Sequence, residues 1–144
     1  MTFQSLAAAL LFIVSLAMAG EADAQSFARY LGHYPYERVG RYALIANPRI
    51  VARVRAIVPS LRVRGWVLSA PVGVPIVRTH NYIKASGCEQ HNCGPHHWSI
   101  FVDDTASRVA VCYYEADARR PVRWFGDRMI INAMPNGSTS LCPF

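Results

Sequence analysis

Several sequence features that would indicate a repeat protein or an enzyme are missing from this chain of 144 residues. It has no internal repeat and no low-complexity linker, which excludes arrays of small repeated units. No phosphate-binding glycine loop, catalytic triad or pair of acid groups stands out in the sequence. Asp103 and Asp104 are adjacent, and since neighbours on a strand point to opposite faces, they indicate a turn rather than an acid pair. We therefore do not expect an enzyme.

Lysine is nearly absent, and acidic residues are few. Lys84 is the only lysine among 15 basic residues, against nine acidic ones, so the formal net charge is +6. A basic balance can indicate nucleic acid or another anionic polymer as partner. The arginines are spread along the chain rather than clustered, and the N-terminus indicates export, so we expect no nucleic-acid partner. Anionic polymers of the cell wall or cell surface are the alternative.

Only one long apolar run is present, and it lies at the N-terminus. Leu6–Ala19 ends in small residues, which is typical of the hydrophobic region of a secretory signal and is short for a membrane span. Of two small-x-small cleavage sites, at 17–19 and 22–24, we favour the second. We predict a signal peptide at 1–24 and a single mature domain at 25–144, periplasmic or secreted, without a membrane span after cleavage. This domain would carry 15 basic and seven acidic residues, a formal charge of +8.

Four cysteines remain after the predicted cleavage, an even number, which in an exported protein favours disulfides. Three pairings are possible, and we favour Cys88 with Cys93 and Cys112 with Cys142. The first pair is close in sequence. The second would tie a tail that contains proline and glycine back onto the domain.

The clearest element is a helix that begins at Asn47-Pro48, because Asn is a preferred N-cap and Pro suits the first helical position. Apolar residues then recur at the spacing of one helical face until Pro59 ends the helix. They are Ile50, Val51, Val54, Ile57 and Val58.

The remaining pattern predicts short strands that follow one another in hairpins. We expect a short helix at 27–31, strands at 61–68, 76–86, 98–102 and 108–114, a turn at 103–107, a loop at 115–122, a short helix capped by Asp127, and an irregular segment at 135–144. These elements predict an α+β fold: one domain with an antiparallel sheet of about five strands and helices packed on one face.

The motif with the most chemical content is Cys88-Glu89-Gln90-His91-Asn92-Cys93, which connects two predicted central strands. It allows several interpretations. Together with His96 and His97 it contains the ligand types of a zinc site, but the spacing is not that of a zinc finger and a disulfide would remove both thiolates. A catalytic cysteine–histidine pair would need a free thiol. We therefore predict neither a metal site nor a cofactor.

Two further interpretations remain open. The bridge could simply staple an exposed turn, with His91, His96 and His97 as ordinary surface or strand-edge residues. Alternatively, the ring could be a recognition loop that holds His91 at its tip in a fixed shape. A protonated imidazole donates from both nitrogens and so suits a cleft with two carboxylates, which are the catalytic groups of glycoside hydrolases.

The ring resembles the Cys-Lys-Pro-His-Asp-Cys loop of the Ivy family, the periplasmic inhibitors of vertebrate lysozyme. The flanks agree in kind, with a β-rich approach ending in 85–87, a following strand at 98–102 and the aromatic-Gly segment 124–126. The resemblance covers roughly 47–126. It implies a sheet with helices on one side and a loop histidine, here His91, that enters the lysozyme cleft and contacts the catalytic Glu and Asp.

Three ring positions differ from the family, so the resemblance is that of a divergent member: Glu89 stands in place of Lys, Gln90 in place of Pro and Asn92 in place of Asp. A carboxylate beside His91 would be repelled by a target's acid groups, so we expect Glu89 to point away or to meet a cation. Asn92 is expected to orient the imidazole through its side-chain oxygen. The resemblance implies a lysozyme-type muramidase or a lytic transglycosylase as partner. A homodimer is another possibility, and a basic envelope-binding module with an inert disulfide is the alternative function.

Overall fold

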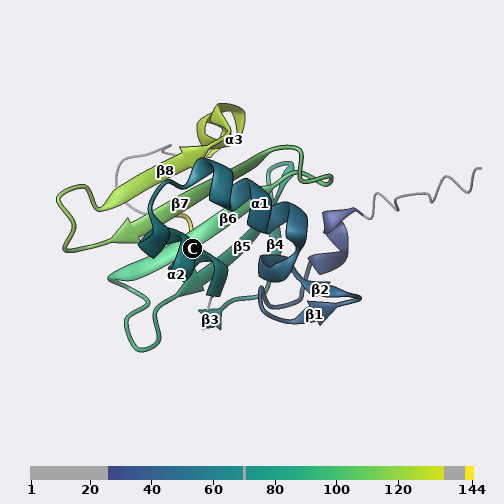
Figure 1. The fold of residues 1–144 in the computed structure, drawn as a ribbon, viewed down its shortest axis with the longest axis horizontal. Coiled ribbons are helices and arrows are strands. Elements are labelled where there is room, and N and C mark those ends of the chain that lie inside the picture. Colours follow the sequence, from purple (N-terminus) through teal and green to yellow (C-terminus); the bar gives the residue numbers. More distant parts are fainter. Residues whose placement is uncertain (1–25, 70, 135–141) are drawn as a thin grey trace, which may run out of the picture.

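Six short strands form the main sheet of the described part of the chain, and the helices of that part pack against it (Figure 1). The computed structural model describes residues 26–69, 71–134 and 142–144. The predicted signal peptide at 1–24 and most of the segment predicted to be irregular, 135–141, lie outside the described residues. The described chain is one α+β domain, as predicted.

All strand pairs of the sheet are antiparallel, in the order β3-β5-β6-β7-β8, with β4 also paired to β5. The central strands follow one another through tight connections, so the predicted hairpin around 103–107 is confirmed. A separate two-stranded ribbon, β1 with β2, lies beside the first short helix. The bounds are β1 Arg38–Val39, β2 Tyr42–Ala43, β3 Val72–Gly73, β4 Val77–Thr79, β5 Tyr82–Cys88, β6 His96–Val102, β7 Val109–Glu115 and β8 Val122–Gly126.

Helix α1 (Pro48–Ile57) begins as the sequence predicts and packs on one face of the sheet. The Asn47 side chain accepts a hydrogen bond from the Arg49 amide at 3.0 Å, which satisfies one of the free N–H groups at the helix start. Ile50 and Val54 are fully buried against the strands. Short 3-10 turns, η1 (Phe27–Tyr30) and η2 (Leu44–Ala46), complete this layer.

The segment predicted as a strand at 61–68 is a helix, α2 (Leu61–Ser69), so that prediction is wrong. Alternation of apolar and basic residues at its start resembles a strand. Val63 and Val67 are four positions apart, and both are nevertheless fully buried against the face of the sheet that α1 covers. The Ser60 hydroxyl accepts a hydrogen bond from the Val63 amide at 3.3 Å and helps to begin the helix.

A second, smaller apolar cluster lies on the other face of the sheet. Phe101 and Ala110 point to this side and pack with Ile130 of the short helix α3 (Arg128–Ala133), whose Asp127 N-cap is confirmed. The prediction of helices on one face therefore holds for α1 and α2, and α3 adds cover on the opposite face. Within the described residues, no helix has the length and apolar character needed to cross a membrane.

Candidate functional site

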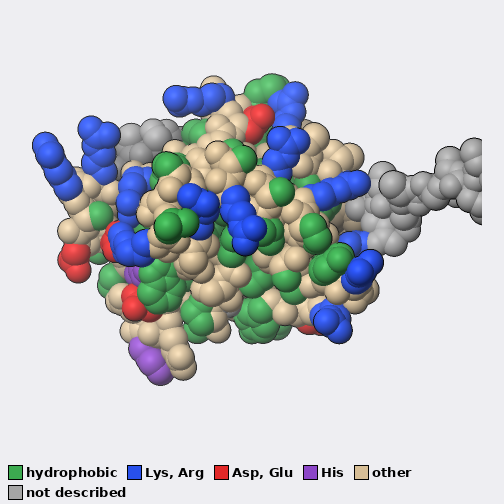
Figure 2. Space-filling view, viewed as in Figure 1, with side chains coloured by type: hydrophobic (Ala, Val, Ile, Leu, Met, Phe, Trp, Pro, Cys, Tyr) green, Lys and Arg blue, Asp and Glu red, His purple; other side chains and the backbone are tan. Residues whose placement is uncertain are grey.

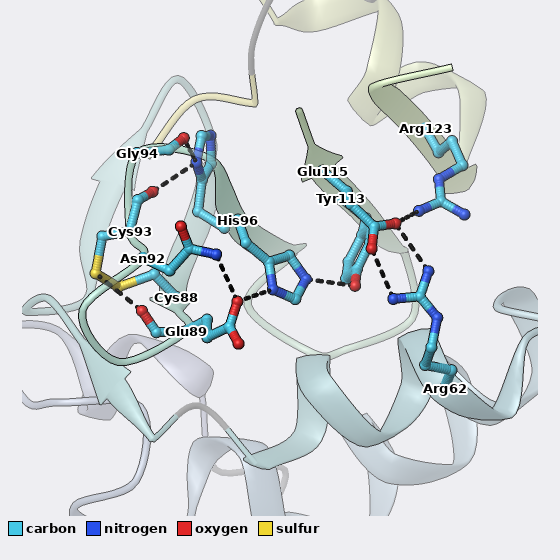
Figure 3. Close-up of polar contacts among 11 residues, drawn as sticks. Arg62, Cys88, Glu89, Asn92, Cys93, Gly94, His96, Tyr113, Glu115 and Arg123 are labelled. Atoms are coloured by element: carbon cyan, nitrogen blue, oxygen red, sulfur yellow. Dashed lines mark hydrogen bonds and ion pairs between the residues drawn. A yellow bond between two sulfur atoms is a disulfide. The ribbon is translucent and has the colours of Figure 1, made fainter. Parts of the chain in front are cut away.

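The predicted ring is closed in the structure and lies at one end of the sheet (Figures 1 and 3). Cys88 ends β5 and is bonded to Cys93, with 4.8 Å between their Cα atoms. Cys88 is fully buried, whereas Gln90 and His91 at the turn are exposed. One side of the ring is thus anchored in the sheet, and the tip faces solvent.

Three backbone hydrogen bonds shape the loop between β5 and β6. The Glu89 amide donates to the His96 carbonyl at 3.1 Å, the Asn92 amide to the Glu89 carbonyl at 3.0 Å, and the His96 amide to the Asn92 carbonyl at 2.9 Å. His91 has a φ of +62°, in the left-handed region, which His and Asn enter more readily than most residues. The loop is therefore a tight, internally bonded turn.

The Glu89 carboxylate points back into its own loop (Figure 3). It accepts a hydrogen bond from the Asn92 amide nitrogen at 2.7 Å and one from His96 Nδ1 at 2.9 Å. The bond from Asn92 and then that from His96 lower the pKa of Glu89. The expectation that Glu89 turns away or meets a cation is met by these contacts. The role expected for Asn92 is not found, because its side chain donates to Glu89 and forms no hydrogen bond with His91 in the described part of the chain.

His96 joins the loop to the core and is not the strand-edge residue that the sequence suggested. Its residue is only 5% exposed, and its ring lies 4.8 Å from that of Trp66 and 5.5 Å from that of Trp98. Because a carboxylate only accepts, Nδ1 carries the proton toward Glu89. In the neutral ring Nε2 then accepts from the Tyr113 hydroxyl, 2.5 Å away. Asn92, Glu89, His96 and Tyr113 form one hydrogen-bonded chain (Figure 3).

His97 supports the same loop from the opposite face of the sheet. It too is 5% exposed, so its prediction as an edge residue is also wrong. Its Nδ1 donates to the carbonyls of Cys93 at 2.9 Å and Gly94 at 3.1 Å, since both partners only accept. The ring stacks on Tyr114 with 4.7 Å between centroids. Successive side chains alternate between faces of a strand, so adjacent histidines can hold the loop from two sides.

Glu115, at the end of β7, links α2 to the strands near the loop. Its two oxygens accept hydrogen bonds from Arg62 of α2 at 2.7 and 2.8 Å, and Arg123 of β8 donates to one of them at 2.8 Å. The bonds from Arg62 are the main cause of the lowered pKa of Glu115. The Ala116 amide also donates to the Pro95 carbonyl at 2.8 Å, which joins the β7–β8 connection to the loop.

The second predicted disulfide is also present, between Cys112 of β7 and Cys142. Both cysteines are buried on the face that α3 covers, so the bridge fastens the end of the chain to the sheet. With all four sulfurs in disulfides, neither Cys88 nor Cys93 is a thiolate ligand or nucleophile in this state. Among residues 26–69, 71–134 and 142–144, no group of three or more His, Cys, Asp or Glu is arranged to hold a metal ion.

The ring, Glu89 included, is predicted from the sequence, but the two buried residues that hold it, His96 and Tyr113, are not. Glu89, His96 and Tyr113 come from the loop, β6 and β7, and their contact depends on strand register, which pairs His96 with Glu115 and Trp98 with Tyr113. One signal was available. His96 is in phase with Trp98 and Ile100, which are core residues on the face toward α2.

The comparisons with known proteins give no family. No family model, curated protein or solved structure matches this chain. The loop's geometry, the export signal predicted from the sequence and the resemblance of the ring to the Ivy loop are therefore the grounds for a functional proposal.

Proposed function

We propose that this protein is an exported, non-enzymatic inhibitor of peptidoglycan-cleaving glycosidases, a lysozyme-type muramidase or a lytic transglycosylase. It would act by inserting His91 between the catalytic carboxylates of its target, from the periplasm or after secretion. The observation that carries this proposal is the exposed His91 at the tip of a disulfide-closed turn that is bonded on both sides to a rigid sheet.

Rigidity is the first property that supports this role. A loop whose shape is fixed before binding loses less conformational entropy when it enters a cleft. Here a covalent bridge, three backbone hydrogen bonds and two buried histidines hold the frame of the loop. His91 forms no hydrogen bond with the described residues, so its imidazole is available to a partner.

Charge is the second supporting property. An acidic cleft repels a carboxylate, and Glu89 directly precedes the tip. Its hydrogen bonds with Asn92 and His96 keep this carboxylate on the inner side of the loop, paired with groups of its own chain. The negative charge of Glu89 is thus turned toward its own loop, and the protonated imidazole of His91 can donate to two acid groups.

The decisive experiment is an inhibition assay of the purified protein against several lysozymes and a lytic transglycosylase, with His91→Asn beside the wild type. Asn also tolerates the left-handed backbone, so this variant removes the imidazole with little change of loop shape. His80→Asn, the same change at an exposed histidine with a positive φ outside the ring, is the matched control. We expect inhibition by the wild type, a loss of at least about tenfold for His91→Asn, and a small change for His80→Asn. Inhibition of none of the enzymes, or equal inhibition by all three proteins, would reject the proposal.

A basic envelope-binding module is the second candidate, and the distribution of arginine favours it. Basic side chains are scattered over the face of the molecule that α1 and α2 cover (Figure 2). Arg49, Arg53 and Arg55 on α1 are all exposed. Binding to peptidoglycan or an anionic glycan that weakens with salt and does not depend on His91 would support this function instead of inhibition.

A further inference from the structure

A hollow lined by three arginines lies at the end of the sheet away from the Cys88–Cys93 loop. Residue Phe27 of η1 lines the hollow and shows where it lies. The Phe27 amide donates at 2.8 Å to the carbonyl of Asp104, in the turn between β6 and β7. That turn is at the opposite end of β6 from His96. The hollow has a volume of about 470 Å³ and is lined by Phe27, Arg29, Arg41, Tyr42, Asn47, Pro48 and Arg49.

The lining is positively charged, and among the described residues no acidic side chain contributes to it. Arg29 comes from η1, Arg41 from the turn between β1 and β2, and Arg49 from the first turn of α1. The ion pairs formed within the described residues involve other arginines, Arg62, Arg78 and Arg123, and none of these three. Three arginine side chains thus line one depression, and none of them forms an ion pair within the described chain.

Aromatic rings hold two of these guanidinium groups. Arg29 lies over the ring of Tyr30 at 5.0 Å and donates to the Tyr30 hydroxyl at 3.2 Å, while its Nε is buried and has no partner among the described residues. Arg41 lies over the ring of Tyr42 at 5.4 Å. Cation–π contacts of this kind restrict the side chains and leave their N–H groups able to donate to a ligand.

The start of α1 adds to the positive potential. The N-terminal end of a helix carries a partial positive charge, and the first turn of α1 contains no acidic residue to offset it. Asn47 and Pro48, the cap and first residue of this helix, both line the hollow. The arginines remain the principal donors, because the Arg49 amide is already bonded to the Asn47 side chain.

We infer that this hollow binds a phosphate group of high charge, such as a diphosphate or the phosphate of a phosphorylated saccharide or lipid headgroup. Guanidinium groups form paired hydrogen bonds with phosphate oxygens, and three of them match a ligand with two or more negative charges better than a single carboxylate. The half-buried Tyr42 offers a ring beside the charged group. This inference does not rest on the inhibitory function, since the site is separate from the His91 loop.

Calorimetric titration of the purified protein with inorganic pyrophosphate tests the site. The variants are Arg29→Gln, Arg41→Gln and Arg49→Gln, with Arg55→Gln as the matched control. Arg55 is exposed on the same helix as Arg49 and does not line the hollow, so its loss lowers the net charge equally. We expect saturable binding that each lining variant weakens by about fivefold or more, and the control by less than about twofold. No saturable binding, or equal weakening by Arg55→Gln, would overturn the inference.

Folding and ligand source are separated by two further measurements. Arg41 and Arg49 are exposed, so their variants should melt at the wild-type temperature, and a loss of binding in a folded variant is then a loss of the site. Phosphatidylcholine vesicles that contain phosphatidic acid test the lipid source. If the protein binds these vesicles, if pyrophosphate displaces it from them and if Arg41→Gln weakens the binding, the ligand is a lipid headgroup. If the protein binds pyrophosphate but not the vesicles, the ligand is a soluble phosphate.

Discussion

The two disulfides should have different consequences when they are removed, because they close loops of different length and hold different parts of the molecule. Cys88 and Cys93 are five positions apart, and Cys112 and Cys142 are 30 positions apart. The chain-entropy model gives about 2 kcal/mol of stability for the short loop and about 4 kcal/mol for the long one. Alanine at both members of each pair removes the bridge without placing a hydroxyl in a buried site.

Urea denaturation of the two double variants measures these differences. Cys112→Ala with Cys142→Ala should lose about twice as much free energy of unfolding as Cys88→Ala with Cys93→Ala, and it should leave the His91 loop intact. The short-loop variant should lose less free energy of unfolding but more inhibition. Its loop has to be ordered when it binds the target enzyme, and if this ordering costs the whole 2 kcal/mol, inhibition weakens by up to about thirtyfold.

Hydrogen exchange provides a test that does not depend on the target enzyme. In the short-loop variant the Asn92 and His96 amides, which close the turn through bonds to Glu89 and Asn92, should lose protection, while amides in the centre of β6 should keep it. Equal loss of stability in both double variants would show that the short bridge is a general support of the fold. Unchanged Asn92 exchange and unchanged inhibition would refute the reasoning that the bridge fixes the loop.

Two further predictions concern residues that join elements. Glu115→Gln removes the charge that binds Arg62 and Arg123, and because Arg62 is more than half exposed we expect a loss of only about 1–2 kcal/mol by urea denaturation. The pKa of Glu115 is lowered in the folded state, so this contribution is complete above about pH 5 and is lost as the pH falls through the folded pKa. Wild type and variant should therefore converge in stability in acid, and a constant difference would contradict the ion-pair explanation. Gly126→Ala should cost about 2–4 kcal/mol, since Gly126 has a φ of +99° and a Cβ there would lie 2.4 Å from the Val109 carbonyl oxygen. Gly65→Ala, where a Cβ meets nothing within 4 Å, is the control in α2 and should stabilise the protein by about 0.5–1 kcal/mol; equal effects at both positions would contradict the steric argument.

Local signals in the sequence were sufficient for much of the fold. Asn47-Pro48 predicts the start of α1, and the turn at 103–107 predicts the β6–β7 hairpin, because caps and turns depend on residues close in the chain. Helix α2 was missed for a physical reason. The alternation of its first residues resembles a strand, and only the sheet surface beneath it shows that Val63 and Val67 are buried together.

The candidate site was predictable only where it depends on residues that are close together in the chain. Ring closure depends on two nearby cysteines and was visible in the sequence. The contacts of Glu89 with His96, and of His96 with Tyr113, depend on which strands pair and in which register. The period of β6 indicates that His96 is buried, but no local pattern shows which residues it contacts, so these contacts emerge only when the strands are assembled.

In the Cys88–Cys93 loop, the residues that fix its shape are different from the residues that are exposed to a partner. The frame consists of the bridge, the Glu89 carboxylate and the backbone bonds that fix the turn, whereas Gln90 and His91 are exposed and take no part in the hydrogen bonds found within the described residues. Exchange of the two tip residues should therefore leave the scaffold intact, provided that the second accepts the left-handed backbone. A library of sequences at these two positions could give the same domain new recognition properties, much as hypervariable loops diversify a common framework.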